Sequence, residues 1–262
     1  MLQLNSHNYF SDAANRDYMS SSQFSAFRRC EAAALAEIQG RWRRPKSTAL
    51  LVGSFIDSWV EGTLDDFMAD NPELFSSRGP TKGQLKAEFR DAEIMIDRIQ
   101  SDTFFMSYLD GIKQRIVTAQ IGGVWFKAKL DIDHPKRIVD FKTMRDFEPI
   151  YSAAEGARLT PWEYWGYIRQ GAIYREAVRQ ADGVKKPFFN ACVTKQSPPD
   201  IAVVSFPDEK LDMELEIVEH YAPHYDEIKK GKVEPTRCER CDFCRASRIL
   251  TGTVDYLEAT NV

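Results

Sequence analysis

Three residues that could act together in catalysis, Asp131, Asp140 and Lys142, lie in residues 124–143, which read VWFKAKLDIDHPKRIVDFKT. This segment is predicted to form two strands joined by a turn over 134–137. Side chains alternate faces along a strand, so Asp140 and Lys142 point the same way, and pairing of the strands brings Asp131 beside them. Carboxylates hold Mg²⁺, while a lysine orients or activates water and neutralises phosphate charge. The pattern predicts metal-dependent cleavage of phosphodiester bonds.

The spacing D-x8-D-x-K resembles the catalytic core of the PD-(D/E)xK nuclease superfamily, with aspartate where many members have glutamate. The helix GSFIDSWVE over 53–61 resembles the RecB-type first motif G-x3-H-x3-E, and YIRQGAIY over 167–174 resembles the Q-x3-Y motif. The opening SSSQFSAFRRCEAAA (20–34) and the ending RCERCDFCRAS (237–247) add to this likeness. Over residues 18–250 the chain therefore resembles the phage and prophage exonuclease VIII (RecE-like) group.

This resemblance implies an α/β fold with a restriction-endonuclease-like core, in which helices flank a central mixed sheet. Asp131 and Asp140 would ligate Mg²⁺ or Mn²⁺, with Asp57 as a third carboxylate. The backbone carbonyl of Phe141 is a further candidate ligand. Lys142 would position or deprotonate the attacking water. The remaining catalytic candidates, expected to hold the substrate or to support the metal ligands, are Gln170, Tyr174 and Glu61.

One position departs from the family pattern. The first motif usually carries a histidine that helps to bind the metal, and this chain has Asp57 there. A carboxylate oxygen is a hard ligand that suits Mg²⁺ or Mn²⁺ better than softer metals. Activity is therefore expected, with a shifted metal preference or affinity.

Composition predicts an ordinary globular protein. The 262 residues are 43% hydrophobic, which is enough for a sizeable core. A single nuclease domain is expected over 1–262, with the first motif in N-terminal helices (20–62), the catalytic sheet and Q-x3-Y helix at 110–206, and a cysteine clasp at 232–250. No apolar run of about 18 residues and no signal-peptide pattern is present, so a cytoplasmic location without membrane contact is expected.

Charge leaves a nuclease function open. The net charge of −4 argues against a generally basic nucleic-acid coat protein, but the metal ions of a nuclease supply local positive charge. Basic residues also cluster around Trp42, as a phosphate-binding rim with an aromatic ring for base stacking or as a solvated helix end and loop. Both interpretations stay open. The cluster consists of Arg28, Arg29, Arg41, Arg43, Arg44 and Lys46.

Five cysteines suggest a metal centre rather than disulfides. An odd number without a secretory signal argues against a disulfide framework. The C-x2-C-x2-C pattern puts Cys238, Cys241 and Cys244 around one small volume. With Cys30 as a distant fourth ligand, the set resembles the iron–sulfur (4Fe–4S) staple of RecB-type nucleases such as AddB, though their last spacing is longer. A tetrathiolate site also suits Zn²⁺, so iron–sulfur, zinc and free thiols stay open. Cys192 is predicted to be a buried apolar residue.

Local patterns predict the other elements. His220 and His224 are spaced for metal binding but lack an evident third ligand, so they are interpreted as surface or packing residues. Residues 1–19 are predicted to be a loop or a short edge element, and residues 64–81 are predicted to be rich in loops. Helices are predicted over 20–39, 47–61, 82–100, 103–109, 160–181 and 208–230, and strands over 112–120, 123–133, 138–143, 187–195 and 201–206.

These features together predict a Mg²⁺-dependent deoxyribonuclease. The family resemblance implies a 5′-to-3′ exonuclease that acts on double-stranded DNA ends and leaves 3′ single strands for recombination. It also points to a single-strand annealing recombination protein as a partner and to a ring-shaped homo-oligomer. The alternatives are an endonuclease or single-strand nuclease of the same superfamily, or a catalytically weak DNA-binding protein that retains the fold.

Overall fold

A computed structural model describes residues 2–43, 47–253 and 255–256. The strands are β1 (Ile112–Ile121), β2 (Val124–His134), β3 (Arg137–Met144), β4 (Ile150–Ser152), β5 (Ala157–Leu159), β6 (Phe188–Thr194) and β7 (Ile201–Ser205). The helices are α1 (Asp12–Asp17), α2 (Ser21–Arg29), α3 (Glu31–Ile38), α4 (Thr48–Glu61), α5 (Leu64–Asp70), the 3-10 helix η1 (Pro72–Leu74), α6 (Ala87–Gln100), α7 (Thr103–Tyr108), α8 (Pro161–Tyr164), α9 (Tyr167–Asp182), α10 (Asp208–Lys229) and α11 (Asp242–Ala246). None of the helices in these residues is both long enough and apolar enough to cross a membrane.

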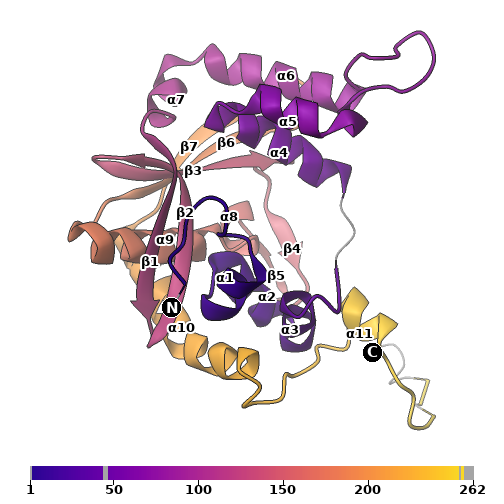
Figure 1. Cartoon of the computed structure of the whole chain (residues 1–262), viewed down its shortest axis with the longest axis vertical. Coiled ribbons are helices and arrows are strands. Elements are labelled where there is room, and N and C mark those ends of the chain that lie inside the picture. The colour runs from indigo at the N-terminus through magenta and orange to yellow at the C-terminus, as the bar shows by residue number, and fades with distance from the viewer. Residues whose placement is uncertain (1, 44–46, 254, 257–262) are drawn as a thin grey trace.

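One mixed sheet of five strands, in the order β1-β2-β3-β6-β7, organises the molecule (Figure 1). The strands β1, β2 and β3 are antiparallel neighbours, β3 and β6 are parallel, and β6 and β7 are antiparallel. A parallel pair needs a crossover connection, and helices α8 and α9 lie in the connection from β3 to β6. The hairpin β4–β5 forms a separate small sheet within the same connection.

Helices cover both faces of this sheet. On one face, α4 and α6 pack in a cluster that joins Phe55 to Ile132 and Val139. On the other face, α2, α9 and α10 pack in a second cluster that includes Leu130 and Ile138. Neighbours Ile138 and Val139 belong to opposite clusters because successive side chains of a strand alternate faces. The predicted fold class, a central mixed sheet flanked by helices, is confirmed.

Two helices predicted as continuous are broken. The prediction over 20–39 is wrong at Cys30, whose extended backbone (φ −166°, ψ 111°) separates α2 from α3. The prediction over 160–181 is wrong at Gly166, whose left-handed backbone (φ 72°) separates α8 from α9. Glycine adopts a positive φ without side-chain clashes, and hydrophobic periodicity does not reveal that choice.

Two segments without a predicted helix contain helices. Residues 1–19, predicted as a loop or a short edge element, include α1, and the loop-rich residues 64–81 include α5 and η1. With six residues after its N-cap Ser11, α1 is too short to give a periodic pattern. The chain beyond α1 joins the main sheet, because Met19 forms a β-bridge with Phe126 of β2. The hairpin β4–β5 is likewise missing from the prediction.

Helix α9 approaches the sheet closely at Gly171. A Cβ atom on this residue would lie 2.3 Å from a ring carbon of Phe188 on β6. Phe188 is itself buried and packs edge-on against Tyr174 of α9. The missing side chain therefore lets α9 lie close enough to the sheet for Gln170, the preceding residue, to reach Asp140 on β3.

We expect Gly171→Ala to lower the free energy of unfolding by about 1–3 kcal/mol, the usual effect of overpacking. Chemical denaturation measures this. The matched control is Gly53→Ala, because Gly53 lies inside α4 with no atom within 4 Å of a Cβ placed there. Alanine favours helix over glycine by up to about 1 kcal/mol, so the control should be neutral or stabilising. Equal stability of Gly171→Ala and wild type would contradict the close approach.

Candidate active site and cysteine cluster

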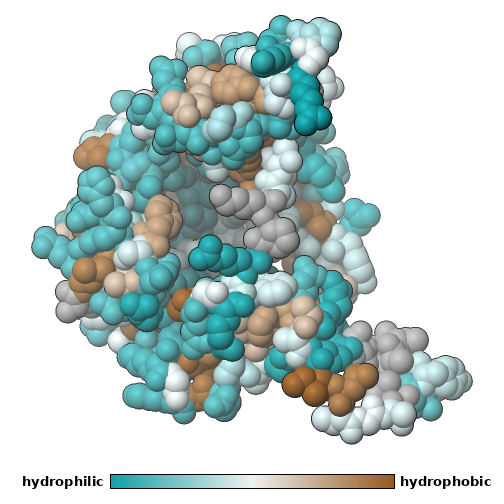
Figure 2. Space-filling model, turned by 45° about the vertical axis from the view of Figure 1, so that its right-hand side comes forward, coloured by the Kyte–Doolittle hydropathy of each residue, from teal (hydrophilic) through white to brown (hydrophobic). Residues whose placement is uncertain are grey.

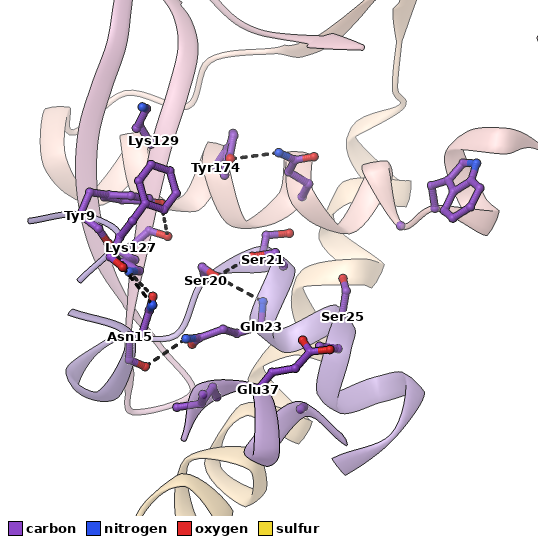
Figure 3. A pocket seen from close by; sticks show the side chains of 18 of the residues that line it. Tyr9, Asn15, Ser20, Ser21, Gln23, Ser25, Glu37, Lys127, Lys129 and Tyr174 are labelled. Atoms are coloured by element: carbon purple, nitrogen blue, oxygen red, sulfur yellow. Dashed lines mark hydrogen bonds between the residues drawn. The ribbon is translucent and has the colours of Figure 1, made fainter. Parts of the chain in front are cut away.

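A cleft of about 1030 Å³ lies between the N-terminal helices, α4, the sheet and the start of α9. Figure 2 shows a hollow on one face of the molecule, bordered mainly by hydrophilic residues. Figure 3 shows part of the lining, with Lys127 and Lys129 on β2, Ser20 to Ser25 on the N-terminal side and Tyr174 on α9. Of the predicted site residues, Asp57, Glu61, Asp131, Gln170 and Tyr174 line the cleft.

The hairpin β2–β3 brings its three predicted residues together. Asp140 is 1% exposed, and its Oδ2 lies 2.6 Å from Nζ of Lys142. Asp131 comes from the opposite strand, and its Oδ2 accepts a hydrogen bond from the Phe141 backbone N–H at 3.0 Å. The contact of Phe141 with Asp131 thus runs through its N–H, and metal binding by its carbonyl stays a prediction.

Helix α4 adds two carboxylates to the same cleft. Asp57 and Glu61 stand one turn apart on α4, and both line the cleft with Asp131. Asp57 is open to solvent from the cleft, but partial desolvation and then the charge of Asp131 raise its pKa to about 7, with Lys142 opposing them. Desolvation also raises the pKa of Glu61. Crowded carboxylates that resist ionisation favour a hard divalent cation, so these residues fit Mg²⁺ or Mn²⁺.

The same crowding acts on Asp140 and Lys142. Burial raises the pKa of Asp140, the charge of Lys142 opposes that change, and the charge of Asp131 adds to it. Burial works to lower the pKa of Lys142, but the charges of Asp140 and Asp131 outweigh it and raise the pKa above its ordinary value. Lys142 is therefore a protonated cation when its carboxylate neighbours carry their charges.

The Q-x3-Y residues contact a predicted metal ligand. Nε2 of Gln170 donates hydrogen bonds to Oδ1 of Asp140 at 2.8 Å and to the Tyr174 hydroxyl at 2.9 Å. The second bond is the dashed line at Tyr174 in Figure 3. The sequence predicts that these residues hold the substrate phosphate or strand. In the structure Gln170 orients Asp140 and bonds to Tyr174 on the next turn of α9, and contact of these residues with the substrate stays a prediction.

Two amide residues of the site escaped the sequence prediction. Asn190 on β6 is fully buried, and its Nδ2 donates to Oδ2 of Asp140 at 3.0 Å. Gln114 on β1 donates to Oδ1 of Asp131 at 3.3 Å. The signal for Asn190 is a lone amide within the apolar run PFFNACV, since a buried polar group needs a partner. No comparable sequence signal exists for Gln114.

The basic cluster is divided by the fold. Arg29, Trp42 and Arg43 line the cleft, as a phosphate-binding rim requires. Arg28 stacks on the ring of Tyr221, 4.4 Å from its centroid, and does not line the cleft. Arg41 is bonded to Gln39 and does not line the cleft either. Arg44 and Lys46 lie outside the described residues.

Exposed aromatic rings flank the start of α9. Trp165 is 51% exposed and lines the cleft beside Gly166 and Tyr167. Tyr164 is 40% exposed and packs edge-on against Trp165, with ring centroids 4.9 Å apart. Aromatic rings accessible beside a charged cleft are suited to stacking with nucleic-acid bases.

Four cysteines form a separate cluster. The sulfur atoms of Cys30, Cys238, Cys241 and Cys244 all lie within 4.8 Å of one another. Cys30 contributes from the break between α2 and α3, and the others surround α11. Cys192 is fully buried elsewhere, as predicted. Among the described residues, this is the group whose ligand atoms already lie together as a metal site requires.

The two histidines of α10 have contacts of their own, outside the cysteine cluster. Nε2 of His224 lies 2.8 Å from Oε1 of Glu31, and the ring of His220 packs against Tyr221. Their interpretation as surface or packing residues is confirmed.

Residues 20–247 match the family described as a PDDEXK-like domain of unknown function (DUF3799). The chain belongs to this family. It is also similar to a crystal structure from Eubacterium rectale described as a "Putative exonuclease", with 43% sequence identity, a TM-score of 0.92 and 99% of each chain covered. No curated protein matches the chain significantly. The comparisons support a PD-(D/E)xK nuclease, which agrees with the chemistry of the cleft.

The raised pKa of Asp57 predicts a pH dependence of stability. Below pH about 4 both folded and unfolded chains carry this proton, and between about 4 and 7 the folded chain holds it more tightly. The contribution of Asp57 to the free energy of unfolding is therefore lost as pH rises through about 7. We expect Asp57→Asn to flatten this part of the curve of thermal stability against pH, measured in chelator.

A divalent cation should stabilise the protein more as pH rises, because it binds the deprotonated carboxylates. Its stabilising effect on wild type should grow as pH rises through about 7, and this growth should be weaker in Asp57→Asn. Parallel curves for wild type and Asp57→Asn, with and without Mn²⁺, would leave Asp57 as an ordinary surface charge.

Proposed function

We propose that this protein is a metal-dependent deoxyribonuclease, acting as a 5′-to-3′ exonuclease on double-stranded DNA ends and leaving 3′ single strands. The observation that carries the proposal is the charge group at the cleft: Asp57 and Asp131 line it, and the Asp140–Lys142 ion pair lies near enough to act on the charge of Asp57. The exonuclease mode is supported by the description of the Eubacterium rectale relative and by the RecE-like motifs. The same motifs support a role in recombination beside a single-strand annealing protein, and a ring-shaped oligomer.

Asp131, Asp140 and Asp57 would hold the divalent cation. When bound, Mg²⁺ polarises the phosphate and makes water a stronger nucleophile. Lys142 is held by Asp140 and lies 4.9 Å from the centroid of the Tyr167 ring, so its ammonium group has a fixed position beside the carboxylates. Its protonated form neutralises charge that develops on the phosphate. A cation bound by the carboxylates would compensate their charge and so lower the pKa of Lys142. Lys142 could then give up its proton more readily.

The walls of the cleft supply groups for a DNA strand. Arg29, Arg43 and Lys129 add positive charge for phosphates along the cleft. Trp165 offers an accessible ring at the entrance to the catalytic residues. An anionic chain with exposed bases, such as a strand separated at a DNA end, therefore matches the cleft better than a small neutral molecule does.

We expect Lys142→Ala and Asp140→Asn each to reduce DNA cleavage by at least about 10²-fold while the protein stays folded, since each loses a charge that acts on the phosphate or its metal. Lys136→Ala is the matched control, because Lys136 is exposed in the turn of the same hairpin. Linear duplexes labelled at either 5′ or 3′ ends, incubated with Mg²⁺, measure both rate and polarity.

Closed circular duplexes and single strands complete this experiment. Resistance of the circle, with early release of the 5′ label, is the expected result. Cleavage of the circle would instead identify an endonuclease, and cleavage of single strands alone a single-strand nuclease. DNA binding without cleavage by wild type would leave a binding protein, and full activity of Lys142→Ala would overturn the site assignment.

The four clustered cysteines are proposed to hold one structural Zn²⁺. Sulfur atoms of Cys30 and Cys244 lie 3.6 Å apart, and those of Cys238 and Cys244 lie 3.9 Å apart. Four thiolates around one Zn²⁺ at about 2.3 Å form a tetrahedron with edges of about 3.8 Å. A 4Fe–4S cluster gives each thiolate its own iron, so its sulfurs stand further apart. The distances therefore favour zinc over the cluster.

We expect protein purified without oxygen to be colourless, with about one zinc per chain by elemental analysis. Cys30→Ser should lose the metal and much of the thermal stability, because binding of a structural metal is coupled to folding. Cys192→Ala, which alters the cysteine outside the cluster, should keep the zinc. Brown protein containing several irons per chain would replace zinc by an iron–sulfur cluster.

A further inference from the structure

Gln114 on β1 has an unusual backbone. Its φ is 56°, in the left-handed region that side-chain-bearing residues seldom adopt. Within the described residues only Glu239 shares this property among non-glycines. Such strain persists where the surrounding structure enforces it, and it gathers at functional sites.

The strain at Gln114 coincides with a change in strand β2. The pairs Lys113–Ile132 and Arg115–Leu130 place Gln114 opposite Asp131. Residues two apart on a regular strand share a face. Leu130, however, packs in the cluster with α9 and α10, and Ile132 packs in the cluster with α4 and α6. The regular alternation of side chains between the two faces of β2 is therefore interrupted at Asp131, directly across from Gln114. At this interruption the side chain of Asp131 lines the cleft.

The side chain of Gln114 holds Asp131. Its Nε2 donates to Oδ1 of Asp131 at 3.3 Å, and the Phe141 N–H donates to Oδ2 at 3.0 Å. Both oxygens of this carboxylate are thus oriented, one by the hairpin backbone and one by Gln114. Asn190 and Gln170 provide the corresponding amide contacts for Asp140.

The side chain of Gln114 also lowers folding stability. Its Oε1 atom is buried without a hydrogen-bond partner among the described residues. A buried acceptor without a donor destabilises a fold, as does a left-handed backbone at a residue other than glycine. A glycine would avoid both costs, so the value of glutamine here lies in what its amide does for Asp131.

We propose that Gln114 is a positioning residue of the metal centre, which fixes the carboxylate of Asp131 in the orientation that binds the divalent cation. This inference rests on the proposed function, because it assumes that Asp131 is a metal ligand. Residues that orient metal ligands typically contribute 10-fold to 100-fold, roughly, to metal affinity. Gln114 is expected to act through metal affinity rather than through folding stability.

The decisive variant is Gln114→Gly, which relieves the backbone strain and removes the amide together. We expect the metal-free variant to be at least as stable as wild type in thermal unfolding, while its Mn²⁺ affinity, measured by calorimetric titration, falls by about tenfold or more. These opposite changes distinguish positioning from a purely structural role. A glycine variant that keeps the wild-type Mn²⁺ affinity would overturn the proposal.

Gln120→Gly is the matched control. Gln120 lies on the same strand, is exposed, and donates its side-chain hydrogen bond to the Gly123 carbonyl outside the cleft. Glycine there should lower stability without changing Mn²⁺ affinity. If Gln114→Gly does not fold, Gln114→Asn gives the same test, because asparagine tolerates the left-handed region and its amide is too short to reach Asp131. Asparagine with wild-type affinity would equally overturn the proposal.

The titration of wild type separates this inference from the proposed function. Mn²⁺ binding by wild type that is lost on Asp131→Asn establishes the metal centre, and the glycine variant then tests Gln114 alone. Wild type that binds no Mn²⁺ would refute the metal centre, and the role of Gln114 with it.

Discussion

The cost of keeping negative charge partly buried beside the cleft is the constraint on which the site depends. Burial, and then the charge of Asp131, oppose the ionisation of Asp57 and Asp140, and Lys142 offsets only part of this cost. The same negative charges hold Lys142 in its protonated form. A group of this kind binds a divalent cation strongly because the cation relieves repulsion that the fold itself maintains. Folding stability and metal binding are therefore linked through the same side chains.

The fold keeps these groups together with amides and close packing. Asn190 and Gln170 both bind Asp140, and Gln114 binds Asp131. Amides orient a carboxylate without neutralising it, so its charge stays available to a cation. Gly171 permits this arrangement, because α9 can carry Gln170 to the sheet only where no side chain separates the helix from β6.

The N-terminal part of the chain is attached at two places. Lys127 of β2 is almost fully buried and donates hydrogen bonds to the Tyr9 carbonyl and to Oδ1 of Asn15. At the other end of this part, Cys30 meets the cysteines around α11, which joins segments more than 200 residues apart. A metal bound by the four cysteines would close this long loop and so restrict the unfolded chain. These attachments hold one wall of the cleft opposite the catalytic hairpin.

The sequence alone determined the hairpin with Asp131, Asp140 and Lys142, the carboxylates one turn apart on α4 and the C-x2-C-x2-C group. Each follows from a period of two along a strand, from 3.6 residues per turn of helix, or from a short motif, and all are local properties of the chain. Cys30, which is distant in the sequence, was added to the cysteine group only by the family resemblance. Tertiary structure decided the helix breaks at Cys30 and Gly166 and the recruitment of Asn190 and Gln114. It also decided the crowding that shifts the pKa values. Contacts between distant segments depend on how helices and sheet pack, and no local period encodes that packing.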